Sequence, residues 1–265
     1  MTILDKIVAH KKKEVEKAKK FTSVKMLESA EFFNRQPLSF KEFLLDANRT
    51  GIIAEFKRKS PSKGVINDKV TVKQVTNAYA EAGASALSVL TDRRFFMGRK
   101  TDLAQARRAN NIPILRKDFM IDEYQVFEAK ALGADIILLI AAILTSEQID
   151  QLATRAKSLG LNVLLEVHNL EELQRSINPK LDAIGVNNRN LADFTVSVDT
   201  SYQLAEHIPA KFMKISESAI SNPQTIRELK KAGFNGFLIG ENFMKQEDPG
   251  VAIREFVKEL QVNQT

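Results

Sequence analysis

The chain has 265 residues, of which 44% are hydrophobic and 27% charged, with a formal net charge of +6 and no cysteine. This length suits two small domains or one large α/β barrel of about 250 residues. Without cysteine, disulfides, thiolate chemistry and cysteine-based metal sites are excluded. No hydrophobic run approaches the roughly 20 residues that cross a bilayer, and the N-terminus lacks a signal-peptide layout. We therefore expect a cytoplasmic protein with no membrane partner.

The positive charge raises the question of nucleic-acid binding. Lysine and arginine are interleaved with acidic residues, as in residues 11–17 (KKKEVEK), and this pattern is typical of a solvated helix face. No zinc-finger spacing, aromatic-basic ribonucleoprotein motif or recognition helix accompanies the charge. We expect no nucleic-acid partner, and a basic nucleic-acid-binding barrel is the non-enzymatic alternative. Excess positive charge also steers small anions.

The first 48 residues are predicted to be a helical extension. Ile3, Ile7 and Val15 lie on one side of an amphipathic helix over residues 2–20, and residues 21–48 carry further apolar residues at helical spacing. From Gly51 onward, β-branched runs alternate with amphipathic helical patterns. Eight candidate strands centre near residues 54, 87, 114, 137, 164, 184, 213 and 238. Helical patterns lie between them, at residues 72–82, 103–110, 121–132, 146–159, 170–177, 198–206 and 225–232.

Strands that alternate with amphipathic helices predict parallel βα units. Four helical patterns end in a glycine just before a strand, at Gly83, Gly133, Gly160 and Gly233, where a left-handed residue stops a helix. Thr71 and the Ser146 segment are expected to cap helix starts. We expect an α/β fold, a single (β/α)8 TIM barrel over residues 49–265 preceded by the extension over residues 1–48, in one structural domain. A doubly wound open sheet is the alternative, but eight strands and no glycine-rich dinucleotide turn disfavour it.

Most of the predicted strands end in charged or polar residues. Desolvating a charge is costly, so a buried strand gains nothing from one at its tip. The C-terminal ends of barrel strands meet at one mouth, which is where active sites lie. Ile53, Glu55 and Lys57 share one face of the first strand, because side chains alternate along a strand. An ordinary Glu55–Lys57 ion pair is the alternative to a functional role. The tips are Glu55 and Lys57, Lys117, Glu166, Asn187, Glu217, and Gly240 with Glu241.

The loop after the first strand is also unusual. It runs for about a dozen residues, whereas βα connections usually have about 2–6, and long barrel loops are often functional. Ser60, Pro61 and Ser62 supply hydroxyl groups and a rigid turn that suit an oxyanion. We hypothesise that this loop and the N-terminal extension cover the mouth of the barrel and exclude water. The alternative is that the extension closes the bottom.

These motifs resemble, in order, those of the indole-3-glycerol-phosphate synthase family, (β/α)8 enzymes of tryptophan biosynthesis. The most specific is residues 53–64 (IAEFKRKSPSKG). The likeness continues through residues 114–119 (ILRKDF), 165–167 (LEV), 184–191 (IGVNNRNL), 216–218 (SES) and 238–241 (LIGE), and includes the helical extension. It therefore covers nearly the whole chain.

The resemblance implies ring closure of 1-(2-carboxyphenylamino)-1-deoxyribulose 5-phosphate, with loss of carbon dioxide and water, to indole-3-glycerol phosphate. It implies a carboxy-lyase that needs no cofactor and no metal and binds a small substrate with a carboxylate and a phosphate. A monomer is compatible with the sequence, which does not give the oligomeric state. A related phosphosugar-binding barrel, such as phosphoribosylanthranilate isomerase, is the alternative enzyme. That isomerisation would not require the residue 55–62 motif together with Lys117 and Glu166.

The implied catalytic residues are Glu55, Lys57, Lys117, Glu166, Asn187 and Glu217. Lys117 is the expected general acid, with a pKa lowered toward the working pH by neighbouring cations and partial burial. Glu166 is the expected catalytic carboxylate, with Glu55 as its partner and Lys57 assisting proton transfer. His168, just beyond Glu166, is expected to be an ordinary loop residue.

The implied substrate-binding residues are Ser60, Phe96, Phe119, Arg189, Ser218, Ala219, Gly240 and Glu241. Ser60, with Asn187 and Arg189 nearby, is expected to bind the carboxylate. The last four offer backbone N–H groups near a helix start for the phosphate. Phe96 and Phe119 form the expected wall around the aromatic ring, or are ordinary core aromatics. Ala219 stands where many family members have glycine, from which we expect a slight shift of the phosphate.

Overall fold

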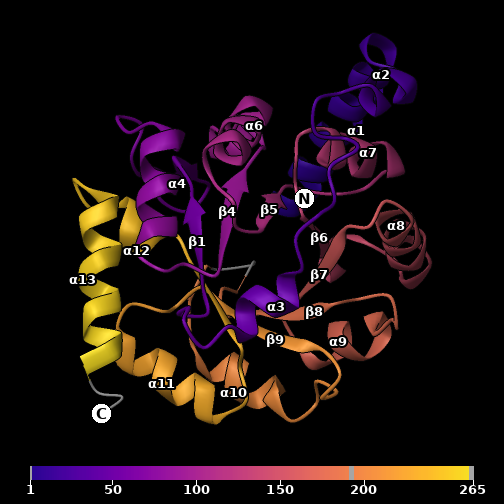
Figure 1. The fold of residues 1–265 in the computed structure, drawn as a ribbon. Helices are drawn as coiled ribbons and strands as arrows, with labels where there is room; N and C mark the ends of the chain where they lie inside the picture. Colours follow the sequence, from indigo (N-terminus) through magenta and orange to yellow (C-terminus); the bar gives the residue numbers. More distant parts are fainter. Residues whose placement is uncertain (1, 191–193, 263–265) are drawn as a thin grey trace.

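The computed structural model describes residues 2–190 and 194–262. Eight parallel strands form a closed barrel with the neighbour order β1-β10-β9-β8-β7-β6-β5-β4 (Figure 1). Each predicted strand centre falls inside one of these strands, so the predicted barrel is confirmed and the open sheet is wrong. The strands are β1 (Ile52–Phe56), β4 (Ala86–Leu90), β5 (Ile114–Lys117), β6 (Ile136–Ile140), β7 (Asn162–Val167), β8 (Ala183–Asn187), β9 (Met213–Glu217) and β10 (Gly236–Ile239).

The seven predicted helical patterns correspond to observed helices. These are α4 (Val72–Glu81), α6 (Lys100–Ala109), α7 (Glu123–Ala131), α8 (Ser146–Ser158), α9 (Leu170–Ser176), α10 (Asp199–Ala205) and α11 (Pro223–Lys231). The sequence patterns did not separate the short elements or the last helix. These are α5 (Arg93–Phe96), η1 (Ala141–Ile143), α12 (Glu241–Met244), α13 (Pro249–Val262) and a hairpin of β2 (Lys59–Ser60) and β3 (Gly64–Val65) within the first loop.

Helix ends follow the expected chemistry with one correction. The four predicted glycines all have positive φ, between 74° and 92°, which only glycine adopts without strain. The Thr71 hydroxyl accepts from Gln74 N and caps α4. Thr145, not Ser146, caps α8, because Thr145 has the extended backbone from which a hydroxyl can reach the N–H of Gln148.

Alternate side chains of the strands build two apolar layers. Ile52, Ala54 and Phe56 are fully buried between β1 and the helices, whereas Ile53 packs in the barrel interior. The interior layer includes the strand residues Ala86, Leu115, Ile136, Leu138, Leu164, Ala183, Ile215 and Leu238. Period two therefore places Glu55 above the interior layer, as the sequence predicted.

The N-terminal extension contains α1 (Ile3–Phe21), α2 (Val24–Glu28) and α3 (Phe40–Leu45), and it reaches both ends of the barrel. Residues of α1 line the cavity at the C-terminal mouth. In α3, Phe40 and Leu44 join the interior layer, and Leu44 packs against Gly236, the first residue of β10. In Figure 1 α3 lies beside the strands and within the ring of outer helices, while α1 and α2 lie beside α7. The extension thus covers the mouth and also closes the bottom.

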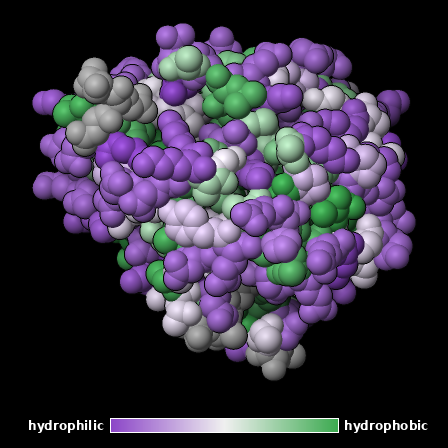
Figure 2. Space-filling view, turned by 90° about the horizontal axis from the view of Figure 1, so that it is seen from below, coloured by the Kyte–Doolittle hydropathy of each residue, from purple (hydrophilic) through white to green (hydrophobic). Residues whose placement is uncertain are grey.

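The surface in Figure 2 is mostly hydrophilic, and hydrophobic residues appear on that face as separate spots. Among residues 2–190 and 194–262, no helix is long and apolar enough to cross a bilayer. Leu191, the last residue of one predicted motif, lies outside the described residues.

Candidate active site

A cavity of about 500 Å³ lies at the mouth formed by the C-terminal ends of the strands. Ile3, Leu4 and Ile7 of α1 also line the cavity. The sequence patterns predicted that the extension covers the mouth but did not identify these residues. Every predicted site residue borders this one cavity: Glu55, Lys57, Ser60, Phe96, Lys117, Phe119, Glu166, Asn187, Arg189, Glu217, Ser218, Ala219, Gly240 and Glu241. The strand tips therefore meet at one cavity, as the barrel geometry predicted.

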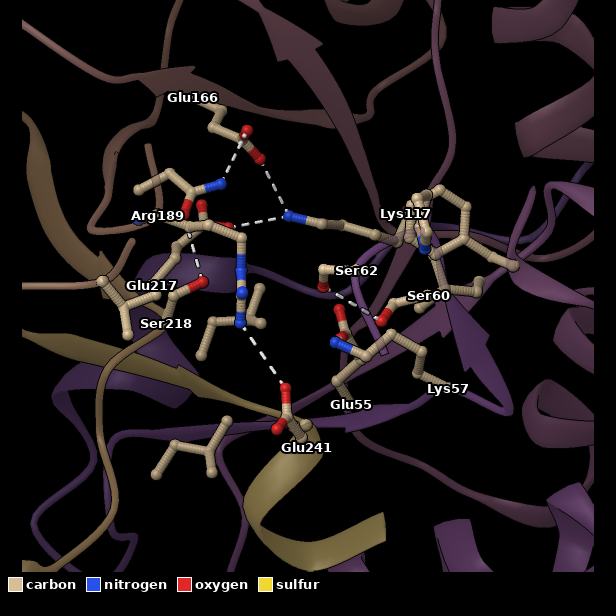
Figure 3. Close-up of a pocket in the computed structure, with 18 of the residues that line it drawn as sticks. Glu55, Lys57, Ser60, Ser62, Lys117, Glu166, Arg189, Glu217, Ser218 and Glu241 are labelled. Atoms are coloured by element: carbon tan, nitrogen blue, oxygen red, sulfur yellow. Dashed lines mark hydrogen bonds and ion pairs between the residues drawn. The ribbon is translucent and has the colours of Figure 1, made fainter. Parts of the chain in front are cut away.

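Lys117 lies at the centre of the charged groups (Figure 3). Its Nζ is 2.9 Å from Glu166 Oε2 and 2.7 Å from Glu217 Oε2. Burial alone would lower the pKa of Lys117, but the carboxylates, first Glu166 and then Glu217, outweigh burial and raise it above its usual range. The expectation of a pKa lowered by neighbouring cations is wrong, because the groups in contact with Nζ are anions. Lys117 is therefore an ammonium at neutral pH.

Glu217 is the acid of this cluster that can change protonation state near neutral pH. Burial raises its pKa to about 7, and the nearby Glu166 carboxylate adds to the shift that Lys117 opposes. Within the described part of the chain, Glu217 Oε1 has no hydrogen-bond partner. Gly185 of the neighbouring strand β8 leaves space for this oxygen, because a Cβ at residue 185 would collide with Oε1. Such a carboxyl group can hold or release a proton at working pH.

Glu166 is held in the opposite, ionised state. Its Oε2 faces Lys117, and its Oε1 accepts a hydrogen bond from Asn187 Nδ2 at 3.0 Å. Burial would raise the pKa of Glu166, but Lys117 and His168 together lower it below its usual range. His168 is not an ordinary loop residue, because its buried ring contacts this carboxylate. The available signal was its spacing, since residues 166 and 168 share a face of extended chain.

A second carboxylate–ammonium pair lies across the cavity. Glu55 Oε1 is 2.9 Å from Lys57 Nζ, and its Oε2 accepts from the Ser88 hydroxyl at 3.2 Å. Burial raises the pKa of Glu55, but Lys57 and Lys117 reverse that effect and lower it. Gly240 permits this packing, because a Cβ there would lie 2.5 Å from Glu55 Oε1.

The first loop brings small polar groups to the cavity. The Ser60 and Ser62 hydroxyls lie 3.4 Å apart, and Ser60 Oγ accepts from Lys63 N at 3.2 Å. Arg189 lines the same cavity as Ser60, and its guanidinium contacts Glu241 at 3.5 Å (Figure 3). Its backbone N–H fixes Asn187 by donating to Oδ1 at 3.0 Å.

The ends of β9 and β10 form the part of the mouth expected to bind phosphate. Ser218 and Ala219 have φ of 67° and 60°, so the loop after β9 is left-handed at two residues that are not glycine. The short helix α12 begins directly after Gly240. A short extra helix after the last strand is a common phosphate-binding feature of these barrels, because its first N–H groups face the anion.

An apolar wall closes the side of the cavity under α1. The Phe96 and Phe119 rings lie 5.9 Å apart and are tilted by 39°, and both line the cavity. Behind this wall, Lys11 of α1 is only 1% exposed, so the interpretation of its segment as a solvated face is wrong for this residue. Its Nζ contacts Asp92 at 3.0 Å and Asp118 at 2.9 Å, and these carboxylates keep the buried ammonium charged.

Comparisons with known proteins agree with this geometry. Residues 4–256 match the family model described as indole-3-glycerol phosphate synthase. The chain is similar to the indole-3-glycerol phosphate synthase of Bacteroides thetaiotaomicron, with 48% identity over 98% of this chain and 99% of that protein. It is 45% identical to that of Laribacter hongkongensis, over 95% and 97% of the two chains.

Solved structures share the fold at much lower identity. A tryptophan synthase complex from Pyrococcus furiosus contains a chain with a TM-score of 0.60 and 16% identity, covering 80% of this chain and 98% of that one. A mandelate oxidase mutant gives a TM-score of 0.61 at 14% identity, over 79% and 71%. These two show the barrel alone. The family model and the near full-length relatives show more: the chain belongs to the indole-3-glycerol phosphate synthase family.

Proposed function

We propose that this protein is a carboxy-lyase that closes the ring of 1-(2-carboxyphenylamino)-1-deoxyribulose 5-phosphate and releases carbon dioxide and water. The observation that carries the proposal is the position of the Lys117 ammonium, which lies in the cavity between an ionised Glu166 and a Glu217 with a pKa of about 7. Family membership does not favour the isomerase alternative.

The first step needs a proton donor at the keto oxygen. When the aromatic carbon attacks the keto carbon, electrons of the C=O bond move to oxygen, which becomes an alkoxide. The Lys117 ammonium is proposed to stabilise this charge and transfer a proton to it. Loss of carbon dioxide from the ring carbon that made the new bond then returns an electron pair to the ring and restores aromaticity. Glu217, 2.7 Å from Nζ, is the proposed source that reprotonates Lys117.

Loss of water needs an acid and a base at once. The hydroxyl of the carbinol must leave with a proton, and the neighbouring carbon must give one up to form the new double bond. Glu166 is the proposed base because Lys117 and His168 favour its ionised form. The Lys57 ammonium, which is paired with Glu55, is proposed to donate the proton to the leaving hydroxyl.

The two ends of the cavity suit the two anions of the substrate. We propose that the carboxylate binds at the hydroxyls of Ser60 and Ser62, and that the phosphate binds at the Ser218–Ala219 loop and the start of α12. The Phe96–Phe119 wall is proposed to hold the aromatic ring. The apolar cover from α1 would exclude water from the charged groups.

The test is turnover of purified substrate, followed by the fluorescence of the indole product. Lys117→Ala and Glu166→Gln should each lose more than about tenfold in kcat, because positioned acid–base groups contribute typically about 10²–10⁴. Lys258→Ala, at an exposed lysine of α13, is the matched control and should keep normal kcat. No product from the unaltered protein, or near-normal kcat in Lys117→Ala, would contradict the proposal.

A further inference from the structure

His168 lies behind Glu166, outside the residues that line the cavity. It follows β7 by one residue, and its side chain is 9% exposed. Its Nε2 is 3.3 Å from Glu166 Oε1, and its Nδ1 is 3.1 Å from Glu172 Oε2. Glu172 Oε2 also accepts the backbone N–H of His168 at 2.8 Å. Each ring nitrogen therefore faces a carboxylate, and Glu172 fixes both the ring and its backbone.

Glu172 is itself held firmly. It lies in the first turn of α9, where the helix dipole favours an anion, and its backbone N–H donates to the N-cap Asn169 at 2.9 Å. A neutral imidazole can donate from one nitrogen only, whereas an imidazolium donates from both. Two flanking carboxylates therefore favour the charged ring. Burial would lower the pKa of His168, but Glu166 and Glu172 outweigh it and raise that pKa to about 10.

The two carboxylate oxygens of Glu166 contact different residues. Oε1 receives Asn187 Nδ2 and faces His168, and Oε2 faces Lys117. Fixing Oε1 from behind leaves Oε2 directed at the ammonium in the cavity. Among the described residues, the charged groups that face the ring are Glu166 and Glu172, and the adjoining η1 turn contributes only Ala141, Ala142 and Ile143.

We propose that His168, anchored by Glu172, is a positioning residue that keeps the Glu166 carboxylate ionised and directed at Lys117. The inference rests on the proposed function, since it concerns the same acid–base pair. It also explains why the two acids beside Lys117 differ. Glu166 contacts two cations, Lys117 and His168, whereas Glu217 contacts Lys117 and keeps a free oxygen. A proton available to the pair therefore resides on Glu217.

Two variants separate the polarity of the His168 side chain from its charge, because Nε2 lies 3.3 Å from Glu166 Oε1 but makes no hydrogen bond to it. His168→Leu removes both, and we expect kcat to fall roughly ten- to a hundredfold, because a catalytic group displaced by about 1 Å can lose about a hundredfold in rate. KM should stay within about twofold, because His168 does not line the cavity. His168→Gln keeps a donor without the charge and should lose less kcat. In both, the acidic limb of the kcat–pH profile should move to higher pH, because Glu166 loses a cation that favours its ionised form.

The matched control is His207→Leu, at an exposed histidine remote from the site, which should leave kcat and the pH profile unchanged. A purely structural His168 would lower the melting temperature of the leucine variant and leave the kcat and acidic limb of the folded protein as they are. That result would overturn the inference. So would equal kcat in His168→Gln and the unaltered protein together with an unmoved acidic limb.

Imidazole nitrogen-15 NMR tests the inference without turnover, so failure of the proposed function can be told apart from failure of this one. The His168 ring should carry protons on both nitrogens at pH 8 and lose one at that pH in Glu166→Gln. A ring that titrates near pH 6.5, the ordinary value for histidine, would overturn the inference even if the unaltered protein makes product. Absence of product would overturn only the proposed reaction.

Discussion

Glu217→Gln should make the protein more stable while it removes activity. The folded-state pKa of Glu217 is about 7, against 4.5 for an unperturbed glutamate. A raised acid pKa means that the folded state binds more protons than the unfolded state between these values, so the stability contributed by this group falls as pH rises from 4.5 to 7. One pKa unit corresponds to about 1.4 kcal/mol, so ionising Glu217 in the fold costs about 3 kcal/mol above pH 7.

Glutamine avoids this cost because it stays neutral. The difference in unfolding free energy between variant and parent should be small near pH 4.5, grow through pH 6, and level off above pH 7 at about 3 kcal/mol in favour of the variant. For a chain of this size that is a rise in melting temperature of about 6–12 °C at pH 8. Thermal unfolding of both proteins from pH 5 to pH 8 measures it, with Glu259→Gln, at an exposed glutamate, as the control. A pH-independent difference, or a less stable variant at pH 8, would refute the reasoning.

Three further predictions concern the mouth and the extension. Lys11→Met should lower the unfolding free energy by about 3 kcal/mol at neutral pH, because the substitution leaves the buried Asp92 and Asp118 without their shared cation. Urea unfolding measures this loss, and a loss below about 1 kcal/mol would contradict the prediction. Ala219→Gly should raise the unfolding free energy by up to about 1 kcal/mol, and with it the melting temperature. The left-handed φ at this position is costly for alanine, and that cost exceeds the extra chain entropy that glycine loses on folding. Inorganic phosphate should compete with substrate and appear in a crystal beside Ser218 and Gly240, and an anion at the opposite end of the barrel would be the adverse result.

The fold was predictable because its signals are local and repeated. Each strand of the barrel is a short, mostly apolar run, and four of the helices before a strand end at a glycine with a left-handed backbone, as at Gly83 and Gly233. Period two was enough to separate Ile53 from Ile52 and to gather the charged tips at one mouth. Short elements escaped prediction, since α5 and α12 have too few residues to show a period.

The chemical state of the site was not predictable by the same means. Neighbouring cations were expected to lower the pKa of Lys117, but in the fold the adjacent Arg116 points outward to Glu128 while Lys117 points inward to Glu166 and Glu217. Which charges meet depends on strands far apart in the chain. Lys11 was misread for the same reason, because its two buried partners lie in the loops after β4 and β5.

The arrangement of the extension follows from what the charged mouth requires. The site needs carboxylates removed from water, and burial of Glu217 works against stability. The apolar residues of α1 can stay over these carboxylates only if α1 is bound to the loops that carry the charged residues. Lys11 provides that attachment, because its contacts at Asp92 and Asp118 lie next to the residues that present Phe96 and Lys117. A well-paired buried cation in α1 therefore holds the apolar residues Ile3 and Ile7 over a cluster whose own charges are less well satisfied.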